Sequence, residues 1–147
     1  MALLAANTVT PRPPLNIFEV SRKQLQSNTW FQIATVPSYY VPKNGPINAK
    51  TIDTVAIMTG LVITNLANTS IKASARIRGT DSVYYTVIES APIPPNDFLT
   101  VSIERQVMMS GEILEVSIPS NTSAANHAHV HFSYIVNQRE EFTVLLP

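Results

Sequence analysis

Three histidines at alternate positions form the part of the sequence that most resembles a metal site. They occur in the run His127-Ala128-His129-Val130-His131. In a strand, side chains two residues apart project from the same face, so the three imidazoles would share one side of a sheet. Imidazole nitrogen is a ligand for zinc, iron, nickel and copper. His127, His129 and His131 are therefore the candidate metal ligands.

Three interpretations of this run are open. An enzyme site would need a further ligand, and the cupin pattern of His-x-His with a later Glu fails because Ile135 and Val136 stand at the expected positions. A metal site shared between subunits could form if copies of the strand met at a threefold axis. In the simplest interpretation the histidines occupy the polar face of an amphipathic strand. We adopt this interpretation and expect no bound metal and no cofactor.

Other residue types give no pattern that predicts catalysis. The chain has no cysteine, which excludes disulfides and thiolate chemistry. Its four glycines lie far apart, so the sequence has no glycine-rich loop for phosphate. No serine lies in a nucleophile-elbow sequence. We therefore expect that the protein is not an enzyme.

Tyrosines provide the candidate contacts to a ligand such as a surface glycan. Tyr39 and Tyr40 lie in a loop bounded by prolines and are the candidate ligand contacts. Tyr84 and Tyr85 are adjacent in a predicted strand, so one faces inward and the other outward. A carbohydrate-binding or receptor-binding module is therefore the alternative function.

The composition favours a neutral protein that associates with other proteins. The 147 residues suffice for one domain with its own core. Only 14% of the residues are charged, against roughly 25% in a typical soluble domain. Ten basic and ten acidic residues cancel, and near-zero net charge favours association. The absence of a basic field and of a long apolar run leads us to expect neither nucleic acid nor a membrane as partner.

The spacing of apolar residues predicts strands through most of the chain. Residues 70–78 alternate between small apolar side chains on one face and charged or polar ones on the other. Similar segments, separated by Pro, Gly and Asn turns, occur at residues 29–36, 51–65, 83–89, 98–109, 112–118 and 127–136, and a further edge strand is expected at 142–146. About seven or eight such strands predict an all-β antiparallel sandwich of the jelly-roll or immunoglobulin-like type.

The start of the chain differs from the rest. Three prolines within its first fourteen residues predict an extended arm. Residues 17–27 fit a short helix and equally fit a segment that opens with a strand, and the sequence leaves both alternatives open. We divide the chain into an N-terminal arm, residues 1–28, and a β-sandwich domain, residues 29–147.

Several short motifs resemble those of small β-sandwich virion proteins of tailed bacteriophages. The shared features are an apolar strand with an Asn-rich turn, a polar alternating strand, an Ile-Pro segment, a Gly-acidic-x-Leu-x-Val strand and a closing Ser-Tyr strand. They correspond here to Val62–Asn65, Ile71–Arg78, Pro92–Pro95, Gly111–Val116 and Ser133-Tyr134. The opening segment LNIFEVSRKQLQSNTW is similar to structural proteins of contractile-tailed marine phages.

The resemblance implies a non-enzymatic structural protein located in the virion. Such a protein would be present in many copies in the neck, tail, baseplate or capsid surface. Its partners would be other virion proteins and copies of itself. The resemblance carries over no catalytic residues, and the histidine run is not part of the shared pattern. The alternative is a carbohydrate-binding or receptor-binding module on a fibre or in a capsid decoration protein.

Overall fold

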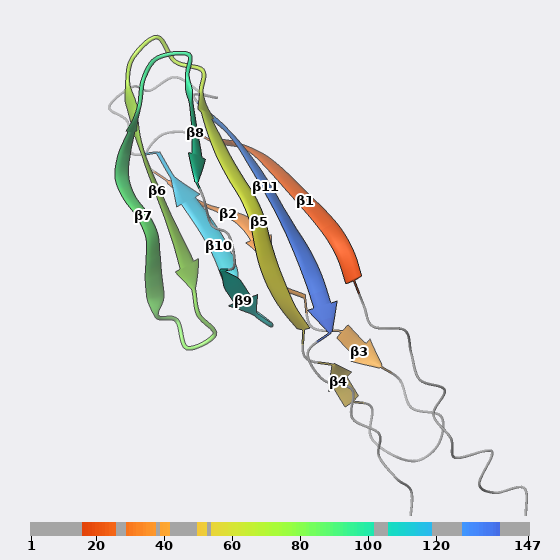
Figure 1. The fold of residues 1–147 in the computed structure, drawn as a ribbon. Helices are drawn as coiled ribbons and strands as arrows, with labels where there is room; N and C mark the ends of the chain where they lie inside the picture. The colour runs from red at the N-terminus through yellow and green to blue at the C-terminus, as the bar shows by residue number, and fades with distance from the viewer. Residues whose placement is uncertain are drawn as a thin grey trace, which may run out of the picture.

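Two antiparallel β-sheets pack face to face (Figure 1). The computed structural model describes residues 16–25, 29–37, 39–41, 50–52, 54–101, 106–118 and 128–138. All regular secondary structure in these ranges is β-strand, which confirms the expected all-β sandwich. Within the same ranges, no helix is long and apolar enough to cross a membrane.

Within the described residues, nine strands form the two sheets. The first sheet has the order β1–β11–β5–β8, and β9 also pairs with β5. Its strands are β1 (Asn16–Leu25), β5 (Thr54–Asn65), β8 (Phe98–Val101), β9 (Val107–Met109) and β11 (Ala128–Gln138). The second sheet, β2–β10–β6–β7, consists of β2 (Trp30–Thr35), β6 (Ile71–Arg78), β7 (Tyr84–Ile93) and β10 (Ile113–Ser117). Two short strands, β3 (Tyr39–Val41) and β4 (Lys50–Ile52), pair separately.

The connections between the strands follow the jelly-roll order. Strands β8 and β9 both pair with β5, so they share one position in the first sheet. Numbering the eight positions in chain order, without the β3–β4 pair, gives sheets 1-8-3-6 and 2-7-4-5. Two four-stranded sheets built from such Greek-key connections are a jelly roll, whereas the immunoglobulin order is different. Of the two expected sandwich types, the structure has the jelly roll.

The N-terminal segment differs most from expectation. The two alternatives for residues 17–27 are resolved in favour of a strand, because residues 16–25 form β1. All ten residues of β1 pair with β11, which lies beside it in Figure 1. The long edge of β11 supplies partners for the backbone of β1, while an isolated helix of this length would be marginal. The short helix is therefore not formed, and the sandwich begins before the boundary expected at residue 29.

Two other segments differ from the expected strands or lie outside the described residues. The segment 98–109 contains two short strands, β8 and β9, rather than one. The edge strand expected at 142–146 lies outside the described residues.

The interior is filled by alternate residues of both sheets. Fully buried side chains include Met58, Leu61, Ile63, Val130 and Phe132 from the first sheet and Leu114, Val116 and Ile93 from the second. The rings of Phe132 and Tyr134 stack, with centroids 4.9 Å apart. Burying a side chain of this size contributes about 1.5–3 kcal/mol to folding. In β6 and β11, the buried residues are those that period-two alternation places on the inner face.

A bulge in β5 keeps both halves of that strand in phase with the core. Thr59 and Gly60 together oppose Ser133 of β11. The Thr59 hydroxyl donates to Ser133 Oγ at 2.9 Å, and a Cβ added to Gly60 would lie only 3.2 Å from the same oxygen. Because of the extra residue, Met58 before the bulge and Leu61 after it are both buried.

Asn65 holds three segments together at the end of β5. Its side chain is fully buried. Its Nδ2 donates to the carbonyl oxygens of Thr69 at 2.8 Å, Ile93 at 3.1 Å and Pro94 at 2.9 Å, and its Oδ1 accepts from the amide of Ala67 at 2.8 Å. These bonds join β5 to the loop before β6 and to the turn after β7.

We expect Asn65→Ala to lower the free energy of unfolding by about 2–4 kcal/mol, because it removes the hydrogen bonds of a fully buried side chain to three segments and leaves a cavity in its place. Chemical denaturation measures the change. Asn68→Ala is the matched control, since Asn68 is an exposed asparagine in the same loop and should change stability by about 0.5 kcal/mol or less. Equal losses in the two variants would contradict this role of Asn65.

Candidate functional site: the outer face of the first sheet

The side chains of the first sheet that point away from the second sheet form a surface that we name the outer face. The strand register arranges these side chains in rows across the strands. One row consists of Phe18 in β1, Ile135 in β11, Ile57 in β5 and Val107 in β9. Phe18 is 72% exposed and Val107 is 48% exposed, and the two residues between them are partly exposed. We name this hydrophobic stripe across four strands the apolar row.

Two rows toward the other end of the strands are mainly polar. They consist of Arg22, His131, Val62 and Thr100, followed by Gln24, His129, Thr64 and Phe98. Among the described residues of the outer face, Arg22 is the only formally charged side chain. The outer face therefore has an apolar row toward one end of the strands and mainly polar rows toward the other, and its described residues include no carboxylate.

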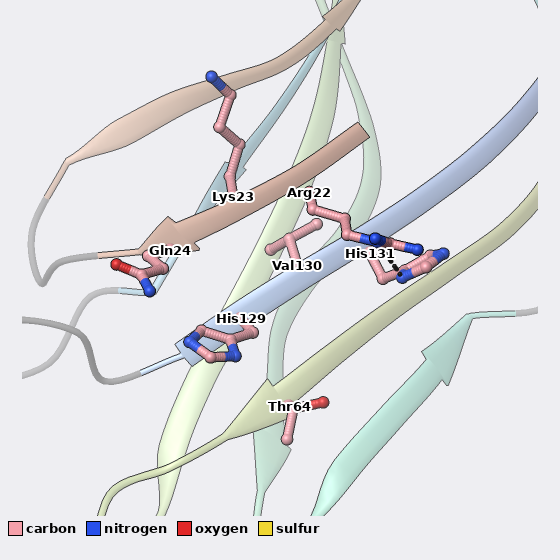
Figure 2. A pocket seen from close by; sticks show the side chains of 7 residues that line it. All are labelled: Arg22, Lys23, Gln24, Thr64, His129, Val130 and His131. Atoms are coloured by element: carbon pink, nitrogen blue, oxygen red, sulfur yellow. Dashed lines mark hydrogen bonds between the residues drawn. The ribbon is translucent and has the colours of Figure 1, made fainter. Parts of the chain in front are cut away.

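A shallow hollow of about 430 Å³ lies among the polar rows. It is lined by Arg22, Lys23, Gln24, Thr64, His129, Val130 and His131 (Figure 2). Arg22 Nε donates to His131 Nδ1 at 3.3 Å, which places the proton of the neutral imidazole on Nε2. Figure 2 shows Lys23 pointing away from both imidazoles. The lining of the hollow thus includes one guanidinium, one ammonium that points away from the imidazoles, and imidazole, amide and hydroxyl groups.

Two of the three candidate metal ligands lie on this surface. His129 and His131 are both exposed on β11, and His127 lies outside the described residues. Among the residues that the structure describes, no group of three or more His, Cys, Asp or Glu side chains could hold a metal ion. Arg22 also occupies Nδ1 of His131 and brings a positive charge beside it. The described side chains therefore offer hydrogen-bonding groups rather than a ligand set for a metal.

The candidate tyrosines lie in different parts of the molecule. Tyr39 and Tyr40 belong to β3, but their side chains are outside the described part of the structure, so their role as ligand contacts stays a prediction. Tyr84 and Tyr85 are the first two residues of β7. Tyr84 pairs with Arg78 on the outward side of the second sheet, and Tyr85 pairs with Ile77 on the inward side. Both tyrosines are about half exposed.

A cluster on the outward side of the second sheet was not predicted from the sequence. The Arg76 guanidinium lies 3.8 Å from the ring centroids of both Trp30 and Tyr84. Arg76 Nε donates to Glu115 Oε2 at 2.8 Å, and Arg78 Nε lies 3.6 Å from Glu115 Oε1. Glu115 is only 6% exposed. We name these five residues the arginine cluster.

One sequence signal could have indicated this cluster. Glu115 stands between apolar residues in the segment Ile-Leu-Glu-Val, and a carboxylate in such a strand needs a cationic partner when it is buried. The alternation of β6 showed only that Arg76 and Arg78 share a face. Their contacts with Trp30 and Tyr84 depend on the order of the strands in the sheet.

Comparisons with known proteins assign no family to the chain. No protein-family model matches it, and a search of curated proteins found no match. The fold, the outer face and the arginine cluster are therefore the observations that bear on function.

We expect Glu115→Gln to lower the free energy of unfolding by about 2 kcal/mol, because it removes the negative charge that Arg76 and Arg78 face. Denaturation measures this loss, and the emission of Trp30, the single tryptophan, reports locally on the contact with Arg76. Glu89→Gln is the matched control, because it removes the same charge from an exposed position in β7. If both variants changed the free energy of unfolding and the Trp30 emission to the same extent, the ion pairs of Glu115 would not be what holds the arginine cluster together.

Proposed function

We propose that this chain is a non-enzymatic structural protein of a bacteriophage virion, assembled in many copies with other virion subunits in the neck, tail, baseplate or capsid surface. The apolar row is the observation that carries the proposal. Phe18 at one end is largely exposed and Val107 at the other is about half exposed, and the row crosses four strands without a polar interruption. Large contiguous apolar surface on a soluble protein typically marks an interaction site.

Burial of the apolar row against a neighbour would supply affinity. Fully burying one such side chain contributes about 1.5–3 kcal/mol, and aromatic residues commonly dominate the binding energy of interfaces. Val20 is also exposed and follows Phe18 on the same side of β1, so it extends the apolar area. The lack of acidic residues among the described side chains of the outer face limits the cost of removing the surface from water.

The arginine cluster provides a second contact surface. Trp, Tyr and Arg are the residue types most enriched at the energetic centres of interfaces. Glu115 and the two rings fix the position of Arg76 before any partner arrives, which lowers the entropy lost on binding. The cluster and the apolar row lie on opposite outward sides of the sandwich. A subunit with contact surfaces on both sides can join two neighbours.

The fold and the sequence motifs support the same proposal. Jelly rolls occur in viral capsid proteins and also in lectins and cupins, so the fold alone does not decide the function. The virion assignment is supported by the resemblance of the β-core motifs to tailed-phage proteins. The low charge of the chain supports a subunit that is surrounded by other proteins.

We expect Phe18→Ser to weaken assembly about tenfold or more while leaving the stability of the folded chain nearly unchanged. The Phe18 side chain is exposed in the isolated chain, so its main contribution would come from burial in the interface. Sedimentation velocity over a range of concentrations measures self-association. Mass spectrometry of particles produced with the variant measures incorporation into the virion.

The matched control for this experiment is Leu66→Ser. Leu66 is a large apolar residue with 45% exposure, but it lies in the loop after β5 and outside the apolar row. Leu66→Ser should associate and incorporate like the parent chain. If Phe18→Ser behaved in the same way, the apolar row would not be the interface, and the proposal would lose its main support.

A further inference from the structure

We infer that the hollow among β1, β11 and β5 binds a sugar acid, a pyranose ring that carries one carboxylate. This inference goes beyond the assembly role, since it concerns the polar end of the outer face and not the apolar row. It also differs in place from Tyr39 and Tyr40, the residues that the sequence indicated for a glycan.

Arg22 and His131 form the part of the hollow that suits a carboxylate. Arg22 Nε is already bonded to His131 Nδ1, so the two terminal nitrogens of the exposed guanidinium remain for a ligand. A guanidinium can donate two parallel hydrogen bonds to the oxygens of one carboxylate. The Nε2–H of His131 is a further donor beside the Arg22 guanidinium. Figure 2 shows these two side chains together at one end of the hollow.

Two cationic side chains, Arg22 and Lys23, line the hollow, and the guanidinium of Arg22 is the one bonded to an imidazole. Arg22 is the only formal charge among the described side chains of the outer face, and Lys23 points away from the imidazoles (Figure 2). A phosphorylated or sulfated polymer would need several cations along a wider surface. A monoanion with further neutral polar groups fits better.

Three further polar side chains line the hollow beside Arg22, Lys23 and His131. Gln24, His129 and Thr64 stand next to one another in one row across β1, β11 and β5. Each of them has both donor and acceptor capacity, as a sugar hydroxyl does. The volume of about 430 Å³ falls in the range of small-molecule sites and far exceeds the needs of a carboxylate alone. The hollow therefore matches a hydroxyl-bearing ring.

An exposed aromatic ring stands beyond the hollow in the same row. Phe98 pairs with Thr64 across β5 and β8 and is 61% exposed. Sugar rings have an apolar face that packs on aromatic side chains, so Phe98 is placed to cover one side of a bound ring. The open shape of the hollow leaves much of a bound ring in contact with water, so we expect weak binding.

The test is a titration of the purified full-length chain with glucuronic acid, followed through the NMR signals of the histidine rings. We expect the signals of His129 and His131 to shift and to saturate. Glucose has the same ring without the carboxylate and should bind at least about tenfold more weakly, because it lacks the charge-assisted hydrogen bonds. Arg22→Gln should weaken the binding of glucuronic acid by a similar factor.

The matched control is Lys72→Gln, which removes one positive charge from an exposed position on β6 in the second sheet. This variant should bind glucuronic acid like the parent chain. Circular dichroism checks that both variants are folded. Unequal binding by the parent and Lys72→Gln would mean that overall charge, and not the hollow, attracts the ligand, and it would overturn the inference.

Three further outcomes would also overturn it. Acetate binding as tightly as glucuronic acid would reveal a simple carboxylate site without sugar recognition. Tighter binding of a glutamate-rich peptide would assign the hollow to an acidic protein partner. Absence of shifts at His129 and His131 with glucuronic acid would remove the site. None of these measurements requires assembly, so their outcomes are independent of the role of the apolar row.

Discussion

Both the apolar row and the hollow depend on the pairing of β11 with its two neighbours, β1 and β5. Ten residue pairs join β11 to β1, and eleven join it to β5. Because side chains alternate along a strand, a slip of one residue would exchange the two faces of β11. Phe132 would then face solvent, and His131 would enter the core. The bulge at Gly60 preserves the same phase along the whole of β5.

Much of the fold could be predicted because alternation is a local property of the sequence. The inward residues of β6 and β11 follow directly from period two, and the structure buries them. The strand β1 could not be predicted with the same certainty. Residues 16–25 become a strand because the edge of β11, more than one hundred residues later, pairs with all of them. The jelly-roll order likewise depends on pairings between distant segments.

The functional surfaces were predictable only in part, for the same reason. The placement of His129 and His131 on one face follows from their spacing. The position of Arg22 beside His131 does not, since the two residues are 109 positions apart. The apolar row is similar, because Phe18 and Val20 alternate on one strand but the other members of the row come from three distant strands. It exists only when the register brings four strands together.

The order of the rows on the outer face links the two proposals. Phe18 and Arg22 are four residues apart in β1, a distance of about 13 Å along a strand. A protein interface commonly buries about 800 Å² on each partner, so an interface centred on the apolar row would extend to the edge of the hollow. The hollow would then lie at the rim, where polar residues keep their contact with water. A charge such as that of Arg22 remains hydrated at a rim, and a small ligand retains access to it. An apolar centre with a polar border is therefore compatible with both assembly and ligand binding by the same sheet.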